Sequence, residues 1–204
     1  MTKTYTFFGG LSMYSGNNPT AIKSQRWLTE TLIELMEEKP YEDISIMDIC
    51  KKADLSRQTF YNFFDSKDEL FRYLLRSTYT EKLNSLKEIP SSNEAISAFV
   101  SVVRENPRIV NAIVKNNMGN LVSDEIFKSI TQFLNKFIPD FEHHSDFSYH
   151  IILLSGALTH FMLYYARNNE ELSEEEMTKI LETFLSGKVF KLIRASKYLK
   201  KFIK

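Results

Sequence analysis

The chain has 204 residues, of which 43% are hydrophobic and 25% charged, a composition typical of a globular protein and not of a disordered or collagen-like one. Lysine plus arginine and aspartate plus glutamate are balanced at 26 each, so there is no overall basic field, and any contact with nucleic acid must rest on local patches. The single cysteine, Cys50, excludes an intramolecular disulfide framework and favours a reducing, cytoplasmic environment.

The first 17 residues contain one lysine, a Gly9-Gly10 pair and no small-residue cleavage pattern, so they do not resemble a signal peptide. We expect residues 1–17 to form a flexible arm. An alternative is that apolar residues of this arm, such as Phe7 and Phe8, dock against the rest of the chain.

From residue 18 onward the apolar spacing is helical, and only six glycines and five prolines are present, which favours long helices over a turn-rich β fold. Asn18-Pro19 is a helix start, and Pro40 ends this first helix because its ring clashes with the preceding turn. Three serines are N-cap candidates for helices at about 45–53, 56–63 and 66–86, namely Ser45, Ser56 and Ser66.

Two acidic residues support this reading of the second helix and its turn. Asp48, three residues after Ser45, completes a loose capping-box pattern. Asp54 lies where the chain must turn before the next helix, and aspartate tolerates a left-handed backbone better than most residues.

Residues 90–93, Pro-Ser-Ser-Asn, are the clearest break in the chain. Helical patterns follow at about 93–105, 107–118, 123–138, 146–168 and 173–195, and no strand-like alternation of useful length is found. We therefore predict an all-α fold of about nine helices. Residues 18–86 would form a helix-turn-helix module with a connecting fourth helix, and residues 87–204 a second helical domain.

Residues 147–166 contain no Asp, Glu, Lys or Arg, over a length that could cross a bilayer. The segment also holds several polar residues, including Ser155, Thr159 and His160, and its flanks carry no basic cluster on one side. We therefore expect a helix that is buried on most sides, and no membrane partner.

The two short helices at about 45–53 and 56–63 form the pattern of a helix-turn-helix. Six apolar residues would pin the pair together, namely Ile46, Ile49, Ala53, Leu55, Phe60 and Phe64. The outward face of the second helix would present Arg57, Gln58, Thr59, Tyr61 and Asn62. Arginine suits guanine edges and Gln or Asn suits adenine, while Tyr61 and Lys67 suit phosphate oxygens. The alternative interpretation is a solvated polar turn on an ordinary helical protein.

The segment ISIMDICKKADLSRQTFYNFFDSKDELF, residues 44–71, resembles the N-terminal signature of the TetR family of transcriptional regulators. The resemblance covers about residues 20–75. The residues that carry it are Ile49, Ala53, Ser56, Thr59, Phe60, Tyr61, Phe64, Lys67, Leu70 and Phe71. Three residues depart from the family pattern: Asp54 replaces a glycine, Phe63 stands where His or Tyr is common, and Pro40 replaces a glycine after the first helix.

The resemblance implies a homodimer whose two recognition helices enter successive major grooves of a palindromic DNA operator. It implies that residues 56–62 contact bases and phosphates, that Tyr61 and Lys67 grip the DNA backbone, and that Ser45 caps its helix near a phosphate. The predicted DNA-binding residues are thus Ser45, Ser56, Arg57, Gln58, Thr59, Tyr61, Asn62 and Lys67.

Charge in this module is nearly balanced, since residues 1–80 hold ten Lys or Arg and eleven acids. One positive face is still conceivable, built from Lys23, Arg26, Lys51, Lys52, Arg57 and Lys67. Few phosphate contacts predict a shallower salt dependence than that of strongly basic DNA-binding proteins.

The resemblance further implies that the second domain encloses an effector pocket and that its last two long helices form the dimer interface. We expect dimerisation through helices at about 146–168 and 173–195, with Gly156 allowing a partner helix to approach, and a small apolar or amphipathic effector. The candidates for the pocket wall are Tyr73, Phe99, Met118, Phe133, Phe137 and His160. The alternative reading of each aromatic residue is core packing.

Two further features are a histidine pair and a basic C-terminal segment. The pair His143-His144, with Glu142 and Asp146 nearby, would be a metal site only if adjacent side chains pointed the same way, so we predict no metal and no cofactor. Residues 188–204 hold seven basic residues and no acid; a solvated helix face is the simpler interpretation, with contact to a membrane surface or DNA as the alternative.

The sequence thus predicts a repressor that is released from its operator by a small-molecule effector. The alternative is a regulator of the same fold that is controlled by a protein partner and activates transcription. We do not expect an enzyme, because the sequence has no Gly-rich phosphate loop, nucleophile motif or paired acid–base constellation.

Overall fold

A computed structural model describes residues 5–8, 11–14, 19–84, 91–135, 145–168 and 172–187. Within these residues the chain is helical apart from one hairpin, which confirms the predicted all-α fold. The nine α-helices of the described residues are α1 (Pro19–Glu38), α2 (Ile46–Lys52), α3 (Arg57–Tyr61), α4 (Lys67–Asn84), α5 (Ser92–Glu105), α6 (Pro107–Lys115), α7 (Gly119–Asn135), α8 (Ser145–Asn168) and α9 (Glu174–Leu185). A single 3₁₀ turn, η1 (Tyr41–Asp43), joins α1 to α2.

The hairpin was not predicted. It consists of β1 (Tyr5–Phe8) and β2 (Leu11–Tyr14), which pair antiparallel. Each strand has four residues, too few for alternation to stand out from the background. Gly9-Gly10 separates the strands in sequence, and such a pair favours a two-residue hairpin turn, a signal that the expectation of a flexible arm did not use.

The predicted serine caps are confirmed. The Ser45 hydroxyl accepts a hydrogen bond from the backbone amide of Asp48. The Asp48 carboxylate accepts one from the backbone amide of Ser45, so the capping box is complete. Ser56 caps α3, and Ser66 accepts from the Glu69 amide in the first turn of α4. These bonds satisfy amides at the helix starts that have no partner within the helix.

Left-handed backbone at three positions sets where the elements end. Asp54 has φ 52°, as expected for the turn between α2 and α3. Asn117, with φ 53°, separates α6 from α7, so α7 starts at Gly119 and not near residue 123. Gly187, with φ 71°, follows α9, which ends at Leu185 and not near residue 195. Each left-handed residue turns the chain away from the helix before it.

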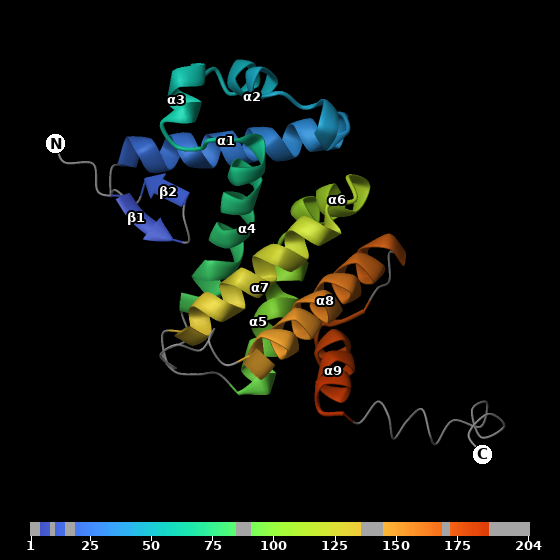
Figure 1. Cartoon of the computed structure of the whole chain (residues 1–204). Coiled ribbons are helices and arrows are strands. Elements are labelled where there is room, and N and C mark those ends of the chain that lie inside the picture. The colour runs from blue at the N-terminus through green and yellow to red at the C-terminus, as the bar shows by residue number, and fades with distance from the viewer. Residues whose placement is uncertain are drawn as a thin grey trace.

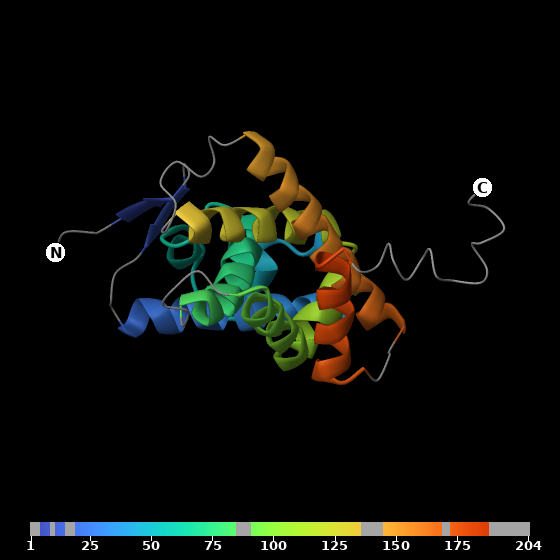
Figure 2. The ribbon, with the colours of Figure 1, turned by 90° about the horizontal axis from the view of Figure 1, so that it is seen from below.

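Figure 1 shows α1, α2 and α3 at one end of the molecule, with α4 running from them into the body formed by α5–α9, and Figure 2 shows the same arrangement from below. In the body α7 packs on α8 and α5 on α9, while α4 packs on both α5 and α7. One continuous cluster of buried apolar residues includes Phe60 of α3, Phe71 of α4, Val100 of α5 and Met177 of α9. A displacement in the body can therefore reach the helix-turn-helix through close packing.

Helix α8 is less buried in the single chain than we expected. Its residues Ile151, Leu158 and Met162 face the core, but Tyr149, Leu153 and other large apolar side chains are exposed. The expected burial on most sides is thus wrong for one copy of the chain. None of the helices in the described part of the chain combines the length and the apolar character that crossing a membrane requires.

Candidate nucleic-acid interface

Helix α3 is only five residues long and is fixed by tertiary contacts. Phe60 is fully buried, and its ring lies 5.8 Å from that of Phe64. At the start of the helix the Ser56 hydroxyl accepts from the Thr59 amide at 3.0 Å and is hydrogen-bonded to the Thr59 hydroxyl at 2.8 Å. An isolated helix of this length would not be stable in water, so the buried aromatic residue and the cap hold it in place.

The outward face of α3 is polar, as predicted. Arg57, Gln58, Tyr61 and Asn62 are exposed, while Thr59 is half-buried. The Arg57 guanidinium carbon lies 5.9 Å from the centre of the Tyr61 ring, which holds the two long side chains together. Donors and acceptors for base edges and phosphates therefore lie on one exposed face of α3.

A tryptophan that the sequence analysis did not single out ties α1 to the turn between α2 and α3. The indole Nε1 of Trp27 donates to the carbonyl oxygen of Ala53 at 3.0 Å. Its ring is 55% exposed, which is unusual for the only tryptophan of the chain. The bond fixes the residue before Asp54, and with it the angle at which α3 leaves α2.

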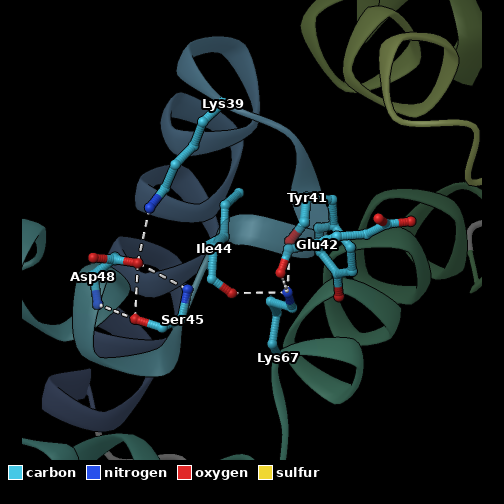
Figure 3. A network of polar contacts seen from close by, with 7 residues as sticks. All are labelled: Lys39, Tyr41, Glu42, Ile44, Ser45, Asp48 and Lys67. Carbon is cyan, nitrogen blue, oxygen red and sulfur yellow. Dashed lines mark hydrogen bonds and ion pairs between the residues drawn. The ribbon is translucent and has the colours of Figure 1, made fainter.

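Ser45 lies in a network of polar contacts at the start of α2 (Figure 3). Oδ2 of Asp48 accepts from the Ser45 amide at 2.9 Å, from the Ser45 hydroxyl at 2.8 Å and from Nζ of Lys39 at 2.9 Å. The hydrogen bond from Lys39, followed by those from Ser45, holds the pKa of Asp48 well below its usual range. Ser45 thus acts as a helix cap, and its proximity to a phosphate stays a prediction.

Lys67 belongs to the neighbouring polar contacts between η1 and the start of α4 (Figure 3). Its Nζ donates to the carbonyl oxygen of Tyr41 at 2.5 Å and to that of Ile44 at 2.7 Å, and it stands 4.2 Å from the centre of the Tyr41 ring. Burial lowers the pKa of Lys67. The ammonium group cross-links the first turn of α4 to η1, so gripping a DNA phosphate would require it to leave these carbonyls.

The conceivable positive face is smaller than the sequence suggested. Lys52 forms ion pairs with Glu34 at 3.3 Å and Glu38 at 2.5 Å, and Lys67 is held by the carbonyls of η1. The other four basic residues of that set are exposed, namely Lys23, Arg26, Lys51 and Arg57. The electrostatic contribution to any DNA contact therefore rests on a few side chains around α1–α3.

The helix-turn-helix is also fastened to α6 of the body. Asn116, which follows α6, accepts from the Tyr41 amide at 2.6 Å through Oδ1. Arg108 of α6 donates to both carboxylate oxygens of Glu37 at 2.9 and 3.1 Å, and Lys115 donates to the Glu37 carbonyl. The end of α1 and the η1 turn thus move with α6.

A small cavity of about 70 Å³ lies among α4, α5, α6, α7 and α8. Aliphatic side chains dominate its wall, including Leu75, Val103, Ile113 and Val122, and the polar residues of the wall include Asn106 and Glu125. Ligand sites for drug-sized molecules usually enclose about 300–1,000 Å³, so this cavity in its present form holds only a few heavy atoms.

Of the six residues proposed for a pocket wall, the five that the structure describes do not line one cavity. Phe99 lines the cavity. Tyr73 packs against Phe64 in the helix-turn-helix module, Met118 and Phe133 are buried elsewhere in the body, and His160 is exposed on α8. Phe137 lies outside the described residues, as do His143, His144 and Glu142. Among the residues that the structure describes, no cluster of three His, Cys, Asp or Glu could hold a metal ion.

Sequence reasoning missed Glu125, which lines the cavity and is bonded to α4. Its carboxylate forms ion pairs at 3.0 Å with both Arg72 and Arg76. The sequence did carry a signal for this residue: Val122, Glu125 and Ser129 follow the three- and four-residue spacing of a buried helix face, where a charged residue requires a partner.

Several large apolar side chains are exposed on α8 and α9. On α8 the exposed residues Tyr149, Leu153 and Tyr164 recur at helical spacing, and His160 lies in the same stripe. At Gly156 an added Cβ would meet no atom within 4 Å. On α9 Ile180 and Phe184 are exposed. Exposed apolar side chains that recur along one face of a helix are typical of a protein–protein interface.

Residues 28–74, which run from α1 into α4, match the family model described as bacterial regulatory proteins of the tetR family. The N-terminal module of this chain is thus a TetR-family module.

Among its relatives, the dhaKLM operon transcriptional activator DhaS of Lactococcus lactis is 31% identical over 74 residues, which are 36% of this chain and 40% of that protein. The transcriptional regulator EthR of Mycobacterium tuberculosis is 36% identical over 67 residues, 31% of each chain. The uncharacterised regulator YxbF of Bacillus subtilis is 22% identical over 84% of this chain and 47% of its own length. The chain therefore spans less than half the length of these relatives.

Solved structures of similar fold extend the comparison beyond the N-terminal module. Lin0861 of Listeria innocua has a TM-score of 0.68 at 16% identity and covers 84% of this chain and 93% of its own. The dihydroxyacetone kinase operon activator DhaS has a TM-score of 0.54 at 20% identity and covers 81% and 96%. At such identities the likeness establishes the TetR fold for the body as well.

Proposed function

We propose that this TetR-family protein is a cytoplasmic, homodimeric DNA-binding regulator of transcription, with α3 of each copy in the major groove of a palindromic operator. The observation that carries the proposal is the exposed polar face of α3, a helix held in place by the buried Phe60 and capped by Ser56. Arg57 and Gln58 would read base edges, with Thr59 and Asn62 beside them, while Tyr61 would contact phosphate. Ser45 and Lys67 would lie near the DNA backbone.

The second copy would pack on the apolar surface of α8 and α9. The exposed apolar residues recur at helical spacing on each helix, and Gly156 leaves room for the backbone of a partner helix. Two recognition helices must be about 34–36 Å apart to reach successive major grooves. A dimer built on α8, the longest of the described helices, would have to hold that spacing.

We further propose that the protein represses transcription by occupying its operator and that a small, apolar effector releases it. The cavity supports this idea because α4 contributes to its wall and also carries the helix-turn-helix. An effector larger than a few heavy atoms would have to expand the cavity, which would displace α4. To act in this way it must bind the form that does not bind DNA more tightly than the form that does.

A second candidate is a regulator of the same fold that activates transcription under the control of a protein partner. The relative DhaS from Lactococcus lactis is named as a transcriptional activator, and the cavity is small. Transcription from a template that bears the operator distinguishes the two candidates, because a repressor lowers the yield of transcript and an activator raises it.

Selection of binding sequences from a random DNA duplex pool, followed by titration of the selected duplex, tests the central proposal. We expect Arg57→Ala and Tyr61→Ala each to weaken binding by roughly 5- to 150-fold, the effect of losing about 1–3 kcal/mol of contact. Lys128→Ala, an exposed change on α7, is the matched control and should bind like the wild type. Wild-type affinity in both α3 variants would refute the proposal.

A further inference from the structure

Glu125 of α7 has two roles that no other residue of the described wall combines. It lines the cavity, and it is the acidic partner of two arginines on α4. Its Oε2 lies 3.0 Å from Nη1 of Arg72 and its Oε1 lies 3.0 Å from Nη1 of Arg76. The side chain is only 3% exposed, so its charge depends on these two partners and not on water.

The two arginines are one helical turn apart on α4, and both are largely buried. Together with Glu125 they form a clasp, a name we use for these three residues. The clasp joins α7 to the middle of α4. The first turn of the same helix holds η1 through Lys67, which donates to the Tyr41 carbonyl, and through Asp68, which accepts from the Tyr41 hydroxyl at 2.7 Å. A change at the clasp is therefore passed along a continuous helix to the DNA-binding module.

The cavity wall around Glu125 is uncharged. Val122 and Ile126 flank it on α7, and Leu75 and Tyr79 face the cavity from α4. Both carboxylate oxygens of Glu125 already accept from arginine, so an ionic ligand would find no unshared opposite charge in the described wall. A guest for this cavity is therefore an uncharged, apolar molecule, and it would act by displacement and not by a new ion pair.

We propose that Glu125 is the positioning residue that couples occupancy of the cavity to the orientation of the helix-turn-helix. The proposal rests on the proposed function. A guest that pushes the cavity wall outward displaces α7 near Glu125, lengthens the bonds to Arg72 and Arg76, and lets α4 shift. Buried ion pairs are sensitive to such a displacement because water does not replace the lost partner.

The chain offers a matched control for this clasp. Lys82 of α4 forms an ion pair with Glu105 of α5 at 2.9 Å, so this pair also joins α4 to the body. Both side chains are exposed, however, and neither lines the cavity. Loss of this second pair should leave the response to cavity filling intact.

The experiment uses a substitution in place of the unidentified effector. Val103→Phe adds part of an aromatic ring to the cavity from the buried face of α5. Affinity for the selected operator duplex is measured by fluorescence anisotropy with and without Val103→Phe in three backgrounds, namely wild type, Glu125→Gln and Glu105→Gln. Because Glu125→Gln leaves two arginines without their acidic partner, a clasp-free background with Arg72→Met, Arg76→Met and Glu125→Met is measured in parallel.

We expect Val103→Phe to weaken operator binding at least fivefold in the wild-type and Glu105→Gln backgrounds, within the usual range of allosteric coupling. In the Glu125→Gln and clasp-free backgrounds we expect less than a twofold effect. The ratio within each background is the decisive readout, since a merely structural role would change basal affinity but not that ratio.

An undiminished effect of Val103→Phe in a folded Glu125→Gln or clasp-free background would overturn the coupling role while leaving DNA binding intact. So would a wild-type background in which Val103→Phe has no effect. A wild-type protein that selects no duplex would overturn the proposed function, and this inference with it.

Discussion

Asp54 decides the turn between α2 and α3 through its backbone alone. Its φ of 52° lies in the left-handed region, which costs most residues about 1–2 kcal/mol and glycine almost nothing. The short polar side chain of aspartate reduces this cost, which explains why the chain can dispense with the glycine that is usual at this position in the family pattern.

We predict that Asp54→Ala has a free energy of unfolding about 1 kcal/mol lower than Asp54→Gly, because alanine has a Cβ and no polar group to offset the left-handed strain. Urea denaturation of the two variants measures the difference. Asp124, exposed in the middle of α7, is the matched control, and there the order should reverse because alanine is the better helix former. Equal stabilities at residue 54 would contradict the argument.

Asp48 gives the stability of the module a dependence on pH. Its hydrogen bonds to Lys39 and Ser45 lower its pKa in the folded state, so the folded protein holds the carboxylate ionised at a pH where the unfolded chain takes up a proton. The resulting stabilisation is fully present above the unfolded pKa of about 3.9 and is lost as the pH falls towards the lower folded value.

We therefore predict that the wild type is more stable than Asp48→Asn at pH 7 and that the difference shrinks as the pH falls below about 4. Urea denaturation across pH 7 to 2.5 measures it. Adding Lys39→Met to both proteins should narrow the difference at pH 7, because Lys39 is the largest cause of the shift. A difference that stays constant with pH would rule out a lowered pKa.

At the scale of elements, the first turn of α4 and η1 act as one unit. Lys67 donates to the carbonyls of Tyr41 and Ile44, Tyr41 donates through its hydroxyl to Asp68, and the Tyr41 amide donates to Asn116. Tyr41 of η1 and Ile44, which follows the turn, thus connect the end of α1 with α4 and the end of α6. The orientation of the recognition helix depends on this junction as much as on the turn within the helix-turn-helix.

We predict that Lys67→Met lowers the free energy of unfolding by about 1–3 kcal/mol, because part-buried carbonyls lose their donor. Lys51→Met, at an exposed lysine of α2, should stay within about 0.5 kcal/mol of the wild type. Urea denaturation provides both values.

The salt dependence of operator binding then separates the two roles of Lys67. If its ammonium group stays on the carbonyls, Lys67→Met leaves the slope of log affinity against log salt concentration unchanged, which is the result we expect. A slope reduced in magnitude by about 0.9 per protomer, or about 1.8 for the proposed dimer, would mean that Lys67 contacts a phosphate in the complex, as the family resemblance implies.

On the scale of the whole molecule, the apolar surface of α8 and α9 has no cover within the described chain. Leu153 is 71% exposed, and Gly156 beside it faces open space. A second copy would bury these residues, and the dimer would then fix the span between the two recognition helices.

We predict that Gly156→Leu converts a dimer into a monomer, because its side chain would fill the space that a partner helix needs. Sedimentation equilibrium measures the association. Since an added Cβ meets nothing in the single chain and leucine is a better helix former than glycine, the thermal stability of the isolated monomer should not fall. A Gly156→Leu protein that dimerises like the wild type would place the interface elsewhere.

Local chemistry explains which features could be predicted. Ser45, Ser56 and Ser66 cap helices through bonds to residues three positions away, and the left-handed turn at Asp54 depends on its own backbone, so the sequence is sufficient for both. The exposed face of α3 followed from the spacing of Phe60 and Phe64, which bury the opposite side. The hairpin at the N-terminal end was missed because four-residue strands carry too little pattern.

The features that escaped prediction depend on contacts between distant residues. Glu125 meets Arg72 and Arg76 across 53 and 49 residues of chain. The cavity is lined mainly by aliphatic residues from five helices and not by the aromatic residues that composition suggested; Tyr73, for example, packs on Phe64. Periodicity tells which face of a helix is buried, but not which neighbour covers it.

The sequence by itself thus determined most of the helices, their caps, the exposed polar face of α3 and the likeness of the N-terminal module to the TetR family, because these follow from interactions within a few residues. Only the tertiary structure decided that Lys67 faces the carbonyls of η1, that Glu125 joins the cavity wall to α4, and that α8 leaves one face uncovered. Those outcomes depend on how the helices cross and pack. Burial makes an unpaired charge or carbonyl unfavourable in free energy, so a buried polar group pairs with the partner that packing brings within reach.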